Sequence, residues 1–154
     1  MPADASDPGR FRVPGRPLNL TDAFLLRHVR AGHGDRPALR CDSLEQGSRV
    51  VSYRELADAA GRFGQVLRAR GIEMEQRVLI VLEDGLDWAA AFFGAQLIGA
   101  TTAFVNPKLS DAELAFYLED TRARARVTTR AVADRVPADA RFLRTTLAVD
   151  DEPD

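Results

Sequence analysis

The sequence predicts an α/β fold in which a parallel sheet carries helices on both faces, forming three layers. Short apolar runs alternate with helical patterns along most of the chain, in the order expected for strands joined by crossover helices. The run Arg77–Leu82 holds five consecutive apolar residues, which indicates a strand covered on both faces. Capping boxes that begin at Ser52 and Ser110 indicate where two of the helices start.

The composition is that of one ordinary globular domain. The chain has 154 residues, of which 45% are apolar and 29% are charged. A chain of this size buries about 68–70% of its unfolded surface. The formal net charge is −2, and the arginines are interleaved with acidic and apolar residues. We therefore expect no nucleic acid and no anionic membrane among its partners.

Three observations suit a reducing, cytoplasmic location. The single cysteine, Cys41, excludes an internal disulfide framework, and its apolar surroundings predict a buried strand thiol. The first residues are polar and lack the apolar stretch of a secretory signal. No run approaches the about 18 consecutive apolar residues of a membrane-spanning helix.

The chain divides into three segments by composition. Residues 1–17 hold four prolines and two glycines and are expected to form a flexible N-terminal arm. Residues 18–149 are predicted to be the folded section. Residues 150–154 have the composition of an acidic tail or linker.

The first elements are predicted from turn and cap residues. Thr21 is the candidate N-cap of a first helix, which ends at Gly32. Pro37–Cys41 and Arg49–Ser52 then predict two strands of a hairpin joined by a long polar loop.

The helix that begins at Ser52 is the best defined. Glu55 completes its capping box, apolar residues recur every three or four positions, and Gly71 closes it. Gly61 and Gly64 fall inside this helix. We interpret them as positions that permit close packing of the helix on the sheet.

A third helix is predicted over Leu86–Ile98, with Asp84 or Asp87 as its cap. It is apolar nearly all round, so we expect it to be buried on most sides. Gly99 ends this helix, and Thr101–Val105 is the next predicted strand.

The last elements follow in the same alternation. Ser110 and Glu113 form the second capping box and begin a helix that continues through Leu118. Two short strands, Ala125–Thr128 and Leu147–Val149, are predicted on either side of a helix at Ala131–Val136.

Residues that usually carry chemistry are scarce. Neither a dinucleotide-binding nor a P-loop glycine motif occurs, and no G-x-S-x-G nucleophile motif is present. His28, His33 and Cys41 lack the spacing of a zinc site. The carboxylates that could form pairs are explained more simply as caps or exposed helix positions; they are Asp84, Asp87, Glu119 and Asp120.

The loop Asn106–Leu109 is the most suggestive local site. It follows the end of one predicted strand and precedes a helix, which is the edge at which parallel α/β sheets bind ligands. Lys108 in this loop could contact a phosphate group. A solvated lysine beside a turn-forming Asn-Pro pair is the alternative.

Residues 18–129 resemble the N-terminal portion of the AMP-forming acid–CoA ligases of the adenylate-forming superfamily, most closely the benzoate–CoA ligase branch. The matching stretches are NLTDAFLLRHVRAGHGDRPALRC, VSYRELADAAGRFGQVLRARGI, QRVLIVLEDGLDWAAAFFGAQLIGA and VNPKLSDAELAFYLEDTRARARV. The resemblance implies an incomplete N-terminal subdomain of the acyl-CoA synthetase-like fold.

The resemblance also implies a reaction for a full-length relative. Such ligases activate a carboxylic acid with ATP and Mg, form an acyl-adenylate and pyrophosphate, and pass the acyl group to coenzyme A. The substrate implied is an aromatic carboxylic acid. The phosphate loop, the acid pocket and the catalytic lysine of these ligases have no counterpart in these 154 residues. No catalytic residue is therefore assigned, and Lys108 is the one residue given a role, as a possible contact for a phosphate of coenzyme A.

The sequence leaves three hypotheses. The first is an N-terminal ligase section that is inactive and binds no cofactor by itself, and whose partner is the missing remainder of the ligase or a second copy. The second is a stand-alone interaction or regulatory module that binds a partner such as a complementary ligase fragment. The third, a small independent hydrolase or transferase, has only unassigned carboxylates in its favour. The first predicts that the isolated chain exposes apolar area and self-associates.

Overall fold

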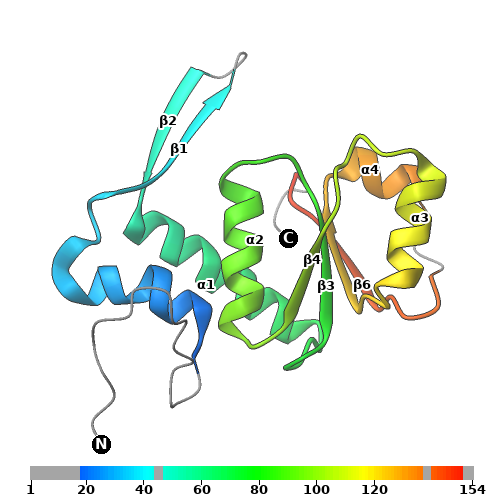
Figure 1. Ribbon diagram of the computed structural model, residues 1–154, viewed down its shortest axis with the longest axis horizontal. Helices are drawn as coiled ribbons and strands as arrows, with labels where there is room; N and C mark the ends of the chain where they lie inside the picture. Colours follow the sequence, from blue (N-terminus) through cyan, green and yellow to red (C-terminus); the bar gives the residue numbers. More distant parts are fainter. Residues whose placement is uncertain (1–17, 44–46, 137–139, 151–154) are drawn as a thin grey trace, which may run out of the picture.

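The computed structural model describes residues 18–43, 47–136 and 140–150. Figure 1 shows a two-stranded hairpin beside a three-layer α/β unit. In chain order the elements are the π-helical turns η1 (Asp22–Leu26) and η2 (Val29–His33), β1 (Pro37–Ser43), β2 (Gly47–Ser52), α1 (Tyr53–Ala69), β3 (Arg77–Val81), α2 (Leu86–Leu97), β4 (Thr101–Phe104), α3 (Asp111–Asp120), β5 (Ala125–Thr128), α4 (Arg130–Arg135) and β6 (Thr145–Ala148). The predicted flexible arm and residues 151–154 of the predicted acidic tail lie outside the described residues.

The main sheet has the strand order β4-β3-β5-β6, and all of its pairings are parallel. Helices α1 and α2 cover one face of this sheet, and α3 and α4 cover the other (Figure 1). The prediction of a three-layer parallel α/β fold is therefore confirmed. None of the helices in the described ranges has the length and apolar character needed to cross a membrane.

Strand β3 lies at the centre of the core. Val78 and Ile80 face the layer of α1 and α2, while Leu79 and Val81 face the layer of α3 and α4. All four side chains are at most 1% exposed. The unbroken apolar run in the sequence thus corresponds to a strand buried on both faces, as predicted.

Helices α1 and α2 make the closest contact between helices. A Cβ atom added at Gly94 would lie 2.7 Å from the carbonyl oxygen of Ala60 and 2.7 Å from Cβ of Phe63. A Cβ atom added at Gly64 would lie 3.1 Å from the carbonyl oxygen of Gly94. Gly64 therefore permits helix–helix contact, and the prediction that it permits helix–sheet contact is wrong. Gly61 faces open space.

Two predicted caps are wrong. Thr21 has helical backbone angles, and its hydroxyl donates to the carbonyl of Phe93 at 2.6 Å. The cap role belongs to Asn19, whose side-chain oxygen accepts from the amide of Asp22. At the start of α2 the N-cap is Gly85, without a side-chain hydrogen bond, so neither predicted aspartate caps this helix.

The capping boxes are confirmed at both predicted positions. At Ser52 and at Ser110 the serine hydroxyl accepts from the amide three residues later, and the glutamate accepts from the serine amide. Gly71 has a φ of 75°, the left-handed conformation expected of a residue that closes a helix. These local predictions succeed because each depends on residues within a few positions.

The hairpin is antiparallel, as predicted, but its strands are longer than expected. Residues 44–46 alone separate the two strands, fewer than the predicted loop contained, and they lie outside the described part. Cys41 on β1 is half-buried, so the prediction of a fully buried thiol is wrong. It packs with other residues of the hairpin and with α1 against a small core that contains Leu25, Val51 and Leu56.

Helix α2 is less buried than its composition predicts. Its alanines and Gly94 are buried, but Trp88, Phe92, Phe93 and Leu97 are only half-buried. The alanine side of the helix faces α1 and the sheet. One apolar side of the helix is therefore left without full cover.

The α1–α2 contact predicts opposite effects of two substitutions. Gly94→Ala should lower the free energy of unfolding by about 1–3 kcal/mol, because the new methyl group meets backbone and Cβ atoms that cannot move independently. The matched control, Gly61→Ala, faces open space in the same helix pair and should raise stability by about 0.5–1 kcal/mol. Urea unfolding monitored by circular dichroism measures both. A Gly94→Ala variant as stable as the wild type would contradict this packing.

Candidate functional site

The candidate site lies at the carboxyl-terminal edge of the main sheet. Strands β3, β4 and β5 all end at this edge, and the loops that follow them surround two adjoining hollows of about 510 and 460 Å³. The residues that line both hollows are Leu82, Glu83, Asp84, Pro107 and Lys108. The predicted rim of the sheet is therefore hollowed, and the predicted loop lies on it.

Lys108 is held in place by its own turn. The side-chain oxygen of Asn106 accepts from the backbone amide of Lys108 at 2.8 Å, which is a typical Asx turn. The ammonium group of Lys108 lies 3.0 Å from a carboxylate oxygen of Glu83. Both side chains are more than two-thirds exposed, so this pair contributes at most about 1 kcal/mol. A phosphate oxygen could replace Glu83 at little free-energy cost.

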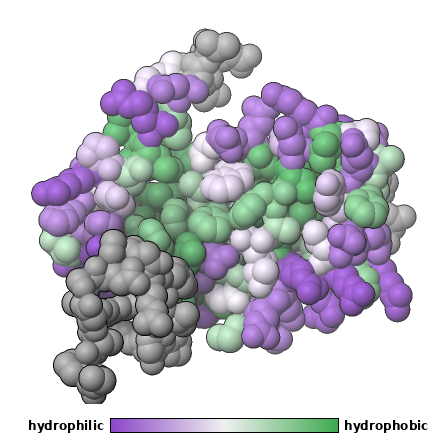
Figure 2. All heavy atoms as spheres, in the orientation of Figure 1, coloured by the Kyte–Doolittle hydropathy of each residue, from purple (hydrophilic) through white to green (hydrophobic). Residues whose placement is uncertain are grey.

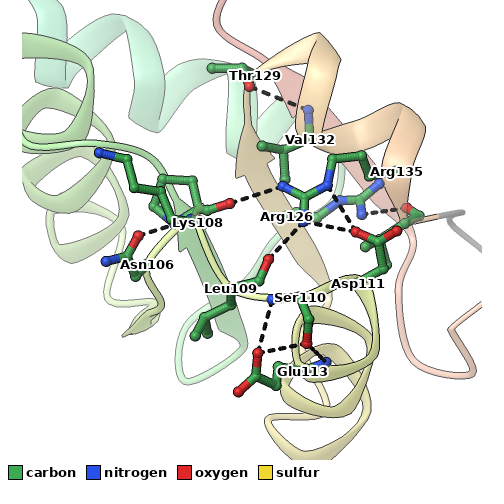
Figure 3. Close-up of polar contacts among 12 residues, drawn as sticks. Asn106, Lys108, Leu109, Ser110, Asp111, Glu113, Arg126, Thr129, Val132 and Arg135 are labelled. Atoms are coloured by element: carbon green, nitrogen blue, oxygen red, sulfur yellow. Dashed lines mark hydrogen bonds and ion pairs between the residues drawn. The ribbon is translucent and has the colours of Figure 1, made fainter.

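Arg135, on α4, fixes the rest of the loop. Its guanidinium donates to the carbonyls of Pro107 and Leu109 at 3.1 and 2.7 Å and to the carboxylate of Asp111 at 2.8 Å. Figure 3 shows these contacts and the side chain of Lys108 extending away from them. The planar guanidinium suits such a multiple contact, whereas a lysine could not reproduce it. Sequence reasoning missed Arg135, because its acceptors lie 24 to 28 residues earlier.

The start of α3 is already occupied by an acidic side chain. The carboxylate of Glu113 accepts from the Ser110 hydroxyl at 2.6 Å and from the Ser110 amide at 2.9 Å (Figure 3). These two hydrogen bonds lower the pKa of Glu113 below its ordinary value of 4.5. The carboxylate therefore holds the position that an anionic ligand would take at this helix start.

The charge around the hollows is mainly negative. Among their lining residues, three are acidic (Glu83, Asp84 and Asp87) and Lys108 alone is basic. A polyphosphate placed here would meet more repulsion than attraction unless further cations joined the site. Within the described ranges, no group of three or more histidine, cysteine, aspartate or glutamate side chains is arranged to hold a metal ion.

The structure separates the other sequence candidates from this edge. His28 stacks on Tyr53 with ring centroids 4.6 Å apart, and His33 lies close by. Glu119 accepts from the amide of Arg141. The two hollows are lined by none of these residues, nor by Cys41 or Asp120. Three of the predicted residues do lie together at the carboxyl-terminal edge of the sheet: Asp84, Asp87 and Lys108.

A parallel sheet between two helical layers makes this chain a three-layer α/β protein, a class in which ligands bind at the carboxyl edge of the sheet. The comparison with protein families is more specific. Residues 26–154 match the family described as AMP-binding enzyme. The chain belongs to this family.

Similar proteins include aromatic acid–CoA ligases. The 4-hydroxybenzoate–CoA/benzoate–CoA ligase of Rhodopseudomonas palustris is 33% identical over 144 residues, which cover 92% of this chain and 26% of that ligase. The fold matches the anthranilate CoA ligase AuaEII with a TM-score of 0.73 at 21% identity, over 86% of this chain and 25% of that chain. It also matches a benzoate CoA ligase from Burkholderia xenovorans LB400 with a TM-score of 0.67 at 28% identity, over 78% of this chain and 23% of that chain. The chain thus resembles the N-terminal part of these ligases and spans about a quarter of their length.

The capping box of α3 predicts a pH-dependent contribution to stability. Because the pKa of Glu113 is lowered in the folded state, its contribution is present above the unfolded pKa and is lost as the pH falls through the folded pKa. The hydrogen bond from the Ser110 hydroxyl is the main cause of the lowered pKa of Glu113. Because Ser110→Ala removes this hydroxyl, the substitution should raise the pKa of Glu113 toward 4.5 in an NMR titration.

The second capping box supplies an internal control. The pKa of Glu55 is lowered by hydrogen bonds from Ser52, so it should stay low in the Ser110→Ala variant. An unchanged pKa of Glu113, or an equal rise at Glu55, would contradict the assignment.

Proposed function

We propose that this chain acts as the N-terminal section of an ATP-dependent, AMP-forming aromatic acid–CoA ligase of the benzoate type. The observation that carries the proposal is the similarity to the R. palustris ligase, which extends over 92% of this chain. The fold likeness to a benzoate CoA ligase supports the same class of substrate. Cys41, the single cysteine of the chain, is consistent with a reducing, cytoplasmic location.

In this proposal the chain supplies scaffold and one wall of the site, while the reacting groups come from the rest of the ligase. Such an enzyme joins the carboxylate of the acid to the α-phosphorus of ATP and releases pyrophosphate. The thiol of coenzyme A then displaces AMP. The three carboxylates around the hollows support this proposal, because they repel a polyphosphate. A polyphosphate can bind beside them only when cations from the rest of the ligase offset their negative charge. We therefore propose that the isolated chain does not catalyse the reaction.

Lys108 is the residue to which we assign a binding role, as a contact for a phosphate of coenzyme A. Arg135 and the Asx turn at Asn106 hold the loop, so the lysine side chain starts from a fixed backbone. Its present partner, Glu83, is exposed and easily exchanged for a phosphate oxygen. A lysine acts here as a point charge, which suits a phosphate group.

The test uses a fused protein in which this chain replaces the matching section of the R. palustris ligase. We expect benzoate-dependent formation of benzoyl-CoA by this protein. Lys108→Ala should raise the KM for coenzyme A about tenfold, since a hydrogen bond to a charged group contributes about 1.5 kcal/mol or more. The KM for benzoate should stay unchanged.

Lys108→Arg is the matched control, because it keeps the positive charge and should leave the KM for coenzyme A within about twofold of the unsubstituted value. An unchanged KM in the Lys108→Ala variant would remove the role given to Lys108. A folded fused protein that forms no benzoyl-CoA would contradict the proposed ligase function itself.

A further inference from the structure

A further hollow, of about 250 Å³, lies at the opposite, amino-terminal edge of the main sheet. Its lining residues are Glu75, Gln76, Arg77, Arg122, Arg124 and Phe142. Arg77 begins β3, and Arg122 and Arg124 come just before β5, so three arginines gather where two neighbouring parallel strands start. We call this space the amino-edge hollow. Figure 2 shows hydrophilic residues gathered at the lower right of the molecule, on the side where the strands of the main sheet begin in Figure 1.

Hydrogen bonds fix the segments that carry these arginines. The amide of Arg124 donates to the carbonyl of Arg77 at 2.8 Å, and the guanidinium of Arg124 donates to the carbonyl of Phe142 at 3.4 Å. The guanidinium carbon of Arg122 lies 5.7 Å from the centroid of the Phe142 ring, which is within the range of a cation–π contact. Two of the three arginine side chains are therefore positioned around one half-buried aromatic residue.

The arginines of the amino-edge hollow have no acidic partner. Arg77, Arg122 and Arg124 form no ion pair with any residue in the part of the chain that the structure describes, whereas other basic residues there do. Glu75 is the one carboxylate among the lining residues. Three guanidinium groups beside one carboxylate leave an excess of two positive charges. This excess matches a phosphate dianion better than a carboxylate, which carries a single charge.

The backbone at Arg122 indicates a role for its side chain. Helices α1, α2 and α3 each end before a residue with a positive φ: Gly71 at 75°, Gly99 at 79° and Arg122 at 51°. Glycine adopts this left-handed conformation without steric cost, whereas an arginine is strained in it. Glu75, with a φ of 65°, is the other non-glycine residue of this kind among the described residues, and it lines the same hollow. Strained residues of this kind cluster at ligand sites.

We propose that the amino-edge hollow binds a phosphate group, free or carried by a small molecule, through the guanidinium groups of Arg77, Arg122 and Arg124. This inference does not depend on the ligase function, and the site shares no lining residue with the two hollows at the carboxyl edge. The planar donors of a guanidinium match the oxygens of a phosphate group. The hollow is smaller than the about 300–1,000 Å³ of ordinary small-molecule sites, so it suits the phosphate group itself.

An NMR titration of the 154-residue chain tests the site. Inorganic phosphate is the probe for a free anion, AMP is the probe for a phosphate carried by a small molecule, and chloride at equal ionic strength is the reference. We expect the amides of Arg122 and Arg124 to shift with at least one phosphate probe and not with chloride. Tighter binding of AMP would assign the phosphate to a larger ligand, and equal or tighter binding of inorganic phosphate would assign it to the free anion. Absence of a shift with either probe at millimolar concentration would overturn the inference, as would an equal shift with chloride.

Arg122→Gly separates binding from folding, because glycine relieves the strained φ while the guanidinium is removed. This variant should bind the phosphate probe about tenfold more weakly, since it loses a charged hydrogen-bond donor. Its urea midpoint should shift upward. Arg77→Gln, at the first residue of β3, should weaken binding by a similar factor. Unchanged binding in both variants would overturn the inference.

Arg62→Gln is the matched control for net charge. Arg62 on α1 is exposed and lines none of the three hollows, so this change removes one positive charge without altering the proposed site. The control should bind the phosphate probe within about twofold of the unsubstituted chain, because salt screens exposed charges that are far apart. Equal weakening by Arg62→Gln and Arg122→Gly would show an effect of net charge alone and would overturn the site.

Discussion

The close contact between α1 and α2 is the constraint on which the rest of the structure depends. Gly64 and Gly94 let the two backbones approach, and this approach presses the alanine side of α2 into the core. The large side chains of α2 are then left on the other side, where Trp88 and Phe92 meet Phe104 at the end of β4. One packing contact therefore completes the core and also leaves these three rings partly exposed.

The sequence predicted the fold well wherever the evidence was local. The two serine capping boxes, the apolar run of β3 and the closing Gly71 each involve residues that are near one another in the chain. The N-cap at Thr21 was wrong because its hydroxyl binds the carbonyl of Phe93, 72 residues later. Gly64 was misassigned for the same reason, since its partner is on another helix.

The candidate site was predicted in part. The position of Lys108 followed from the rule that ligands bind at the carboxyl edge of parallel sheets, and the structure confirms that its loop lies on that edge. The contacts that hold the loop could not be predicted, because Arg135 reaches it from a helix late in the chain. The three acidic residues of the hollows all lie in the segment 83–87 after β3, and it is the parallel pairing of β3 with β4 that brings this segment beside Lys108.

We propose that this section is a scaffold and that the chemistry resides in the rest of an AMP-binding ligase. The most direct measurement is ATP–pyrophosphate exchange by the purified 154-residue chain, with benzoate as the acid and Mg²⁺ present. We expect no exchange above the rate without benzoate. Benzoate-dependent exchange that follows the chain through purification would contradict it, because the reacting groups would then have to lie within these 154 residues.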